Sequence, residues 1–477
     1  MLFFELNFLL LFLAPLLILL ALCCLVGQKR FLPWIGSLAS LIFLYEFSDI
    51  SVAIAIFSIV LNYFGAKYLL KNRSKAVFAT IVGVNLAVLG YFKYSILIDR
   101  TFFGNTLPLT WRIALPLGIS FYTFQQIAFV SDVYRGKVTS FRLRTYMLFK
   151  LFFPQFIAGP ITHFERVRAS YERWPTFNAR SYRYGLSIIA IGFVKKLAGD
   201  YFGGFANQSF GQPHVDFFTA WIGMLSFTFQ IYFDFAGYSD MAVGIARLFG
   251  VSLPFNFNSP YKAASISDFW RRWHMTLSLW LRDYLYIPLG GNRHGALRTA
   301  LALFTTMALG GLWHGAGLNF ILWGVAHGVA LIFVRFFGFK VSRPVGTAIT
   351  FVFVMLTWVL FRANTFHDAM AHYVALLHPS TASIGLELKR LAALFLPWIE
   401  PTGDNHPGQV ALLFSFIAAG LLCLLAPNSQ TIALWFAARR VKSVALVELP
   451  MLVALILVLS VAFISPDTSS AFIYFQF

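Results

Sequence analysis

Apolar runs long enough to cross a lipid bilayer recur along almost the whole chain, and they constrain its fold more than any other feature. A membrane-spanning helix needs about 20 consecutive apolar residues, and only helices or closed barrels satisfy every backbone polar group in hydrocarbon. Of the 477 residues, 59% are hydrophobic and 12% are charged, about half the charged share of a soluble domain. We therefore expect an all-α, polytopic transmembrane bundle with about eleven spans and some re-entrant or interfacial helices.

The positive charge of the chain indicates how these spans are oriented. Lysine and arginine total 37 and aspartate and glutamate total 19, and such an excess in a membrane protein usually gathers in cytoplasmic loops. Basic clusters occur at alternate connections, at residues 29–30, 67–75 and 135–144. This alternation predicts an external N-terminus, cytoplasmic residues 262–298 and an external tail at residues 465–477. Anionic lipid headgroups explain the excess better than a nucleic-acid partner does.

The densest polar segment, residues 267–293, combines tryptophans, arginines and one histidine. Four of its residues share one face at helical spacing, namely Trp270, His274, Leu277 and Leu281. The segment therefore predicts a continuous helix that begins at the N-cap Ser267, carries His274 on its apolar face and stops before Pro288.

Two interpretations of this helix remain open. It is either a basic interfacial helix on the anionic inner leaflet, with His274 in a buried structural slot, or a helix across the cytoplasmic mouth that turns His274 toward an interior cavity. In the second interpretation the arginines attract a phosphate-bearing donor such as coenzyme A. The candidate donor-binding residues are Arg271, Arg272, Trp273, Arg282, Asn292 and Arg293.

A glycine-rich motif at residues 310–317 places a second histidine, His314, between two apolar runs and near the outer end of its span. Glycine permits close backbone approach and broken helices, which membranes tolerate where protein or a water-filled cavity surrounds them. The motif predicts either that His314 lines a cavity or that two helices cross tightly there. An imidazole in a cavity suits general-base catalysis, in which a hydroxyl that attacks a thioester loses its proton. This chemistry needs no metal, and His327 is expected to be structural.

Acidic residues in apolar surroundings and an aromatic C-terminus complete the candidate features. Asp132, Asp234 and Asp240 are interpreted as members of structural ion pairs or helix caps, and a proton or cation pathway is the transporter alternative. The last six residues are mostly aromatic. They predict either an interfacial anchor or a docked segment in which the Tyr474 hydroxyl accepts an acyl group covalently.

Residues 268–293 and 310–317 together resemble the membrane-bound O-acyltransferases, and the resemblance extends over residues 115–334. It implies a funnel-shaped helical fold with a central tunnel, in which His314 corresponds to the family's buried catalytic histidine and His274 to its second histidine. It also divides this single membrane domain into parts with the following ranges: N-terminal spans at 1–110, a core with both histidines at 111–337, C-terminal spans at 338–464 and an extracytoplasmic tail at 465–477.

Within the family, the resemblance is to bacterial membrane subunits that serve the O-acetylation of alginate, cellulose or peptidoglycan. It implies acetyl-CoA as the cytoplasmic acyl donor, an inner-membrane location, and a separate extracytoplasmic SGNH-type acetyltransferase partner that completes transfer to the polysaccharide. The tail resembles a motif of the systems that transfer D-alanine to teichoic acid, so the resemblance assigns Tyr474 as the acyl acceptor. A transporter or flippase and a structural anchor of an export complex are the alternatives from other classes.

Overall fold

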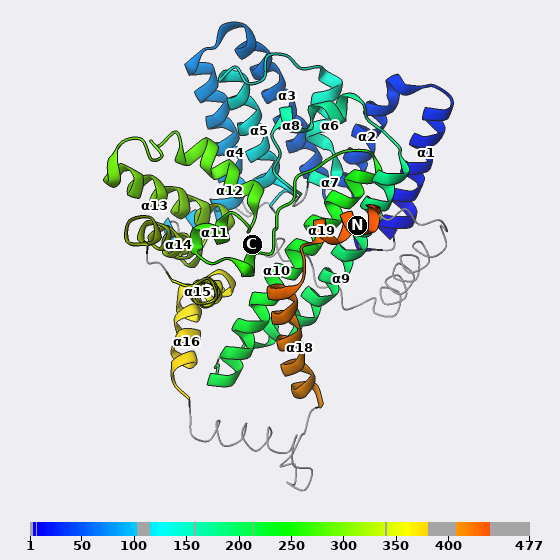
Figure 1. The fold of residues 1–477 in the computed structure, drawn as a ribbon. Coiled ribbons are helices and arrows are strands. Elements are labelled where there is room, and N and C mark those ends of the chain that lie inside the picture. The colour runs from blue at the N-terminus through cyan, green and yellow to red at the C-terminus, as the bar shows by residue number, and fades with distance from the viewer. Residues whose placement is uncertain are drawn as a thin grey trace.

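The computed structural model describes residues 3–5, 7–102, 115–156, 159–212, 214–338, 341–379 and 407–438. Every regular element in these ranges is a helix, which confirms the all-α prediction. Figure 1 shows α1 (Ala14–Leu25) and α2 (Leu32–Tyr45) at one edge of the molecule, and α13 (Gly295–His314) and α14 (Leu318–Phe337) at the opposite edge. The predicted division of the chain into four consecutive parts stays a prediction.

The other helices fill the space between these two edges. In the N-terminal half they are α3 (Asp49–Asn72), α4 (Lys75–Phe102), α5 (Ile119–Tyr134), α6 (Leu143–Leu151), α7 (Phe153–Phe156), α8 (Phe164–Glu172) and α9 (Ala179–Phe210). In the C-terminal half they are α10 (Phe217–Leu248), α11 (Ile266–Trp270), α12 (Met275–Leu281), α15 (Arg343–Arg362), α16 (Phe366–Leu377), α18 (Pro407–Leu425) and α19 (Ser429–Ala438).

Six helices in the described ranges are long and apolar enough to cross a membrane, and a bent pair formed by α18 and α19 raises the number to seven. The predicted count of about eleven is therefore not confirmed. One expected span, residues 446–464, lies outside the described residues. Two further long helices, α9 and α10, are not among these candidate spans, and lysines of α9 face aspartates of α10.

Helices α9 and α10 pack closely along their whole length because glycines face each other across the contact. A Cβ atom on Gly192 would lie 2.7 Å from the carbonyl oxygen of Gly237, and a Cβ atom on Gly185 would lie 2.8 Å from that of Gly244. Small residues of this kind let two helix backbones approach in a membrane protein, where dispersion contacts replace the hydrophobic effect as the attraction between helices.

Two buried ion pairs also join α9 to α10. The ammonium of Lys196 lies 2.9 Å from the Asp234 carboxylate, and that of Lys195 lies 2.7 Å from Asp240. The hydroxyl of Ser429 in α19 donates a hydrogen bond to Asp240 at 2.6 Å. These contacts confirm the interpretation of both aspartates as members of structural ion pairs, which buried carboxylates need in order to stay charged.

Candidate functional site

His314 is the last residue of α13, and its ring is 5% exposed. The imidazole packs edge-on against Trp323 of α14 and Phe361 of α15, with ring centroids 5.2 Å apart in both cases. His314 therefore lies at the end of α13, where side chains of α14 and α15 surround the imidazole. The predicted location of His314 at the end of an apolar helix is confirmed.

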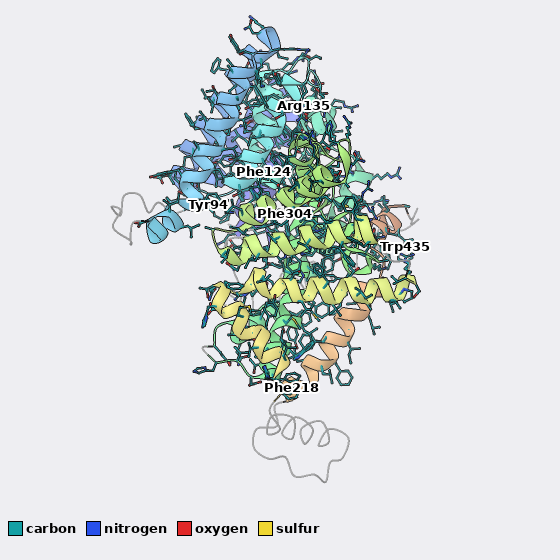
Figure 2. All side chains as sticks on the ribbon, turned by 90° about the vertical axis from the view of Figure 1, so that its left-hand side faces the viewer. Tyr94, Phe124, Arg135, Phe218, Phe304 and Trp435 are labelled. Carbon is teal, nitrogen blue, oxygen red and sulfur yellow. The ribbon has the colours of Figure 1, made fainter. Side chains whose placement is uncertain are left out.

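Two side chains of α4 hold the end of α13 in place. The ammonium of Lys93 donates hydrogen bonds to the carbonyl oxygens of Trp313 and, at 3.0 Å, of His314. The hydroxyl of Tyr94 donates to the carbonyl oxygen of Leu312 at 2.7 Å. These carbonyls have no partner within the helix because it ends there. In Figure 2, the labels of Tyr94, Phe124 and Phe304 mark the region in which α4, α5 and α13 meet.

A tight crossing of α13 and α14 lies one turn before His314. A Cβ atom on Gly311 would collide with the carbonyl oxygen of Phe320 and lie 3.1 Å from the Cα atom of Gly324. The crossing expected for the glycine motif is therefore present. The other expectation, that His314 itself lines a cavity, stays a prediction, although the glycines that follow His314 do line one.

This cavity has a volume of about 870 Å³. Its lining includes the backbone turn at residues 315–317, together with Lys93, Asn207 and Arg362. The Arg362 guanidinium donates a hydrogen bond to the Asn207 side chain at 2.8 Å. The lining begins at Gly315, the residue directly after His314, and the His314 side chain itself is not part of it.

His274 does not lie within one continuous helix, so that prediction is wrong. Helix α11 ends at Trp270, and α12 begins after His274, whose φ of 41° is left-handed. The helix α11 is capped by Ser265, whose side chain accepts from the Asp268 amide, and not by Ser267. The predicted stop before Pro288 is confirmed, because the helical turns end at Tyr286.

The break at His274 is held by an extended segment from another part of the chain. The carbonyl oxygen of Asn256 accepts from the Met275 amide at 2.9 Å, and the Asn258 amide donates to the carbonyl of Arg272 at 2.9 Å. The Asn256 side chain also accepts from the Thr276 hydroxyl at 2.6 Å. These bonds satisfy the polar groups that an intact helix would have paired internally. A left-handed non-glycine residue costs free energy and persists where its surroundings determine it in this way.

The face predicted from helical spacing is nevertheless buried throughout, with Trp270 at 8%, His274 at 0%, Leu277 at 1% and Leu281 at 4% exposure. The His274 ring packs edge-on against Phe235 of α10 at 4.8 Å. Burial lowers the pKa of His274, which lies outside the candidate spans, to about 3. The imidazole is therefore neutral at physiological pH.

Trp313 connects the two histidines. Its ring centroid lies 4.8 Å from that of His314 and 6.4 Å from that of His274. Phe121 and Phe124 of α5 contact the same indole at 5.5 and 5.0 Å. The fold thus brings together two histidines that are far apart in the sequence, with one aromatic ring between them and aromatic walls around them.

His327 has the structural role that was expected. The indole of Trp270 donates to its Nδ1 at 3.3 Å, and its Nε2 lies 3.1 Å from the Thr357 hydroxyl. The ring thereby links α11, α14 and α15 and is fully buried.

The expected donor-binding residues lie on the same stretch of chain but in different environments. Arg271, Arg282, Asn292 and Arg293 are exposed. Arg272 is half-buried and pairs with Asp268 at 3.0 Å, whereas Trp273 is buried and stacks on Phe269. Their role in binding a donor stays a prediction, and Tyr474 lies outside the described residues.

Sequence reasoning missed a polar network beside η5 (Arg282–Tyr286). The Tyr284 hydroxyl lies 2.9 Å from Nδ1 of His163, and the same nitrogen lies 3.3 Å from the Asp132 carboxylate. The Arg135 guanidinium lies over the Tyr284 ring at 5.3 Å. This network anchors the segment that carries the exposed arginines to α5, which confirms an ion-pairing role for Asp132. Its only sequence signal is a histidine close to a Gly-Pro turn.

The fold and the site define a multi-pass helical membrane protein that buries two histidines around one indole, and one of these histidines directly precedes a turn that lines a cationic cavity. Residues 133–366, which include both histidines, match the family described as MBOAT, membrane-bound O-acyltransferase family. The chain belongs to this family.

Three relatives show how the family is represented in bacteria. The chain is 42% identical over 307 residues to "Probable alginate O-acetylase AlgI" of Pseudomonas putida, with 62% of this chain and 63% of the relative covered. It is 40% identical over 381 residues to "Peptidoglycan O-acetyltransferase" of Helicobacter pylori, with 70% and 71% covered. It is 31% identical over 231 residues to "Teichoic acid D-alanyltransferase" of Streptococcus thermophilus, with 45% and 56% covered. The chain thus spans less than two thirds of the alginate relative's length.

Proposed function

We propose that the protein is an O-acyltransferase of a bacterial inner membrane that moves acetyl groups from cytoplasmic acetyl-CoA outward for O-acetylation of an exopolysaccharide such as alginate. The observation that carries this proposal is the position of His314 at the end of α13, directly before the glycine turn that lines the cationic cavity. The similarity to alginate O-acetylases supports the choice of acyl group and acceptor.

His314 is the general base in this proposal. An acceptor hydroxyl transfers its proton to the imidazole while its oxygen attacks the carbonyl carbon of the thioester. The new C–O bond forms, the C–S bond breaks, and the departing thiolate of coenzyme A takes the proton from the imidazolium. Lys93 positions the base, because its ammonium binds the carbonyl of the same residue. The aromatic side chains around the imidazole exclude water that would otherwise hydrolyse the acyl group.

The donor enters from the side that bears residues 262–298, which the positive-inside rule assigns to the cytoplasm. The exposed cations Arg271, Arg282 and Arg293 attract the phosphates of coenzyme A, and Asn292 adds an amide beside them. Arg272 and Trp273 contribute by shaping the turn, since the first pairs with Asp268 and the second is buried. In the proposal His274 is the second histidine of the site, and its ring lies 6.4 Å from the same Trp313 ring that contacts His314.

Transfer to the polymer outside the membrane is completed by a partner. In the proposal, Tyr474 of the external tail takes the acetyl group as a phenyl ester, and an extracytoplasmic SGNH-type acetyltransferase passes it to the polysaccharide. A Tyr474→Phe variant that transfers label from acetyl-CoA to the polymer as the wild type does would remove the tyrosine from this route.

The proposed function is tested with membranes from a host that makes both the protein and the extracytoplasmic partner, to which radiolabelled acetyl-CoA and alginate are added. We expect alkali-labile label in the polymer, because an O-acetyl ester is cleaved by base. Membranes from the same host without the protein are the control. Equal label in both preparations would contradict the proposal.

Peptidoglycan is the second candidate acceptor, because the relative named a peptidoglycan O-acetyltransferase matches a larger share of this chain than the alginate relative does. Replacing alginate by peptidoglycan fragments in the same assay separates the two. Label that appears only in the peptidoglycan fragments would support the acyltransferase activity and identify peptidoglycan as the acceptor.

A further inference from the structure

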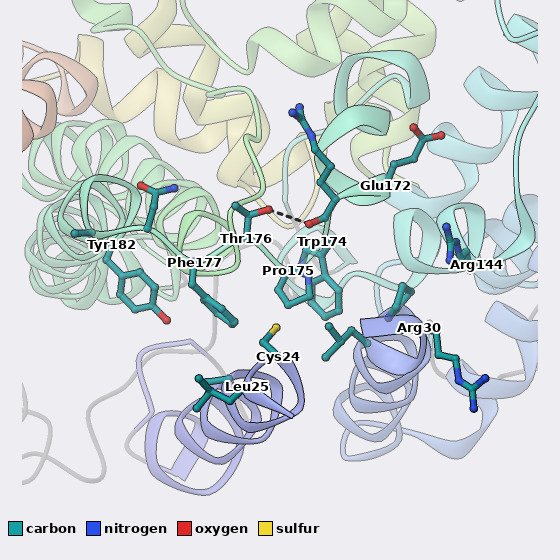
Figure 3. Close-up of a pocket in the computed structure, with 16 residues that line it drawn as sticks. Cys24, Leu25, Arg30, Arg144, Glu172, Trp174, Pro175, Thr176, Phe177 and Tyr182 are labelled. Carbon is teal, nitrogen blue, oxygen red and sulfur yellow. Dashed lines mark hydrogen bonds between the residues drawn. The ribbon is translucent and has the colours of Figure 1, made fainter. Parts of the chain in front are cut away.

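We propose that a cleft on the far side of the molecule from α13 and α14 binds the phosphate headgroup of an anionic phospholipid. The cleft has a volume of about 1090 Å³ and lies between the end of α1, the start of α2 and the segment that joins α8 to α9. Figure 3 shows Cys24 and Leu25 facing Phe177 and Tyr182 across it. Its described lining includes neither His274 nor His314.

Arginines from three parts of the chain lie along the rim of this cleft (Figure 3). Arg30, Arg144 and Arg173 all line it. Glu172, the acidic residue in the described lining, pairs with Arg168 at 2.9 Å, which reduces its effect on a bound anion. Guanidinium groups bind phosphate oxygens in pairs through parallel hydrogen bonds. The Arg173 Nε donates to the Ala169 carbonyl at 3.1 Å, and the arginines along this rim supply further donors for a phosphodiester.

The first turn of α9 adds to this positive character. Asn178 and Ala179 line the cleft, and the Asn178 side chain caps the helix by accepting from the Ser181 amide. The amino end of a helix of this length carries a partial positive charge and favours a bound anion.

The opposite wall of the cleft is apolar and belongs to a membrane span. Ala21, Cys24 and Leu25 come from the last turns of the candidate span Phe8–Leu25, and the Leu25 side chain is 84% exposed. A cleft with cations on one wall and the end of a span on the other fits a lipid, whose phosphate lies at the level of the span's end and whose acyl chains run along it. A soluble phosphate compound would leave this apolar wall without a partner.

The expected orientation of the chain is consistent with this occupant. The basic clusters at residues 29–30 and 135–144 are assigned to the cytoplasm, and Arg30 and Arg144 belong to them. The cytoplasmic leaflet carries anionic lipids, and juxtamembrane cations bind them. Phe177 and Tyr182 supply aromatic rings at the depth where such rings are enriched.

Native mass spectrometry of the full-length protein in detergent tests the proposal. We titrate phosphatidylglycerol, phosphatidylcholine with the same acyl chains, and inorganic phosphate. The expected result is a saturable phosphatidylglycerol adduct at about tenfold lower lipid concentration than for phosphatidylcholine. Equal binding of the two lipids would overturn the proposal. Displacement of phosphatidylglycerol by millimolar inorganic phosphate would also overturn it, because the site would then recognise free phosphate.

A double variant, Arg144→Gln with Arg173→Gln, is expected to weaken phosphatidylglycerol binding by about tenfold or more, since each lost charge-assisted bond costs that order of affinity. The matched control is Arg335→Gln with Arg343→Gln, which removes two exposed arginines elsewhere and should bind as the wild type does. Unchanged binding by the first variant, or equal loss in both, would refute the assignment of the lipid to this cleft.

A further measurement uses no arginine variant, so it tests the proposal even if those variants misfold. In a Cys23→Ala protein, phosphatidylglycerol is expected to slow modification of Cys24 by a maleimide, because the lipid covers the cleft that Cys24 lines. Phosphatidylcholine at the same concentration should not slow it. A rate that is independent of the headgroup would contradict the proposal.

Discussion

Lys93 of α4 donates a hydrogen bond to the carbonyl oxygen of His314 at 3.0 Å, although the two residues are 221 positions apart. The same ammonium lies 5.6 Å from the centre of the Trp313 ring. It therefore satisfies the exposed carbonyls at the end of α13 and places a cation at the negative end of the helix dipole. The position of the candidate general base depends on this contact with an N-terminal helix.

Replacing Lys93 by methionine removes the donor and the charge but keeps the length of the side chain. We expect a loss of about 1.5–3 kcal/mol in stability, the usual cost of a hydrogen bond to a charged group, together with slower acyl transfer because the end of α13 moves. Lys75→Met, at an exposed position near the start of the same helix, is the control. Thermal unfolding and transfer of label from acetyl-CoA measure the two effects, and a variant equal to this control in both would contradict the role of Lys93.

Gly311→Ala tests the crossing of α13 and α14. The added methyl group meets the Phe320 carbonyl and the Gly324 backbone, which cannot rotate away. Overpacking of this kind costs about 1–3 kcal/mol. Gly83→Ala adds the same group to α4 where no atom lies within 4 Å, so it should leave stability unchanged or raise it by up to about 1 kcal/mol. Equal melting temperatures for both variants would show that the crossing is loose.

The buried, neutral His274 predicts that acid destabilises the protein. In the unfolded chain its pKa is about 6.5, whereas burial lowers it to about 3 in the folded protein. The unfolded state therefore binds more protons between these values, so this contribution to stability is complete above about pH 6.5 and is lost as the pH falls toward 3. The substitution His274→Asn removes this titration. Asparagine tolerates the left-handed backbone at this position. Melting temperatures measured from neutral pH to pH 5 should fall less steeply in the variant than in the wild type. Parallel curves would contradict the prediction.

Variants of the Lys195–Asp240 pair test whether these residues form a structural ion pair or belong to a proton or cation pathway. Asp240→Asn leaves the Lys195 charge buried and should cost about 3–5 kcal/mol, and the double variant Lys195→Met with Asp240→Leu should recover much of this loss. Acyl transfer per folded molecule should be retained in the double variant, because the pair joins α9 to α10. A folded double variant that no longer transfers acyl groups would indicate that the Asp240 carboxylate has a functional role.

Much of the site follows from the sequence, because burial and helical spacing are local properties. The spacing of Trp270, His274, Leu277 and Leu281 identified a buried face, and the position of His314 at the end of an apolar run matched the end of α13. Isolated aspartates in apolar surroundings were assigned to ion pairs because a buried charge needs a partner.

The features that sequence reasoning missed depend on contacts between distant segments. The break at His274 is stabilised by the backbone of Asn256 and Asn258, and helical spacing alone gives no sign of it. A signal for Lys93 was present, since a lone lysine inside an apolar run of α4 marks a position that needs a polar partner.

Acetyl transfer by the purified protein with and without the His314 imidazole tests the central claim most directly. The wild type, His314→Ala and His367→Ala are incubated in detergent with radiolabelled acetyl-CoA, and the ester-linked label retained on the protein is counted. The account predicts that His314→Ala is folded and slower by at least about a hundredfold, because the proton acceptor is missing, whereas loss of the exposed His367 has no effect. Transfer by folded His314→Ala at the wild-type rate would contradict it.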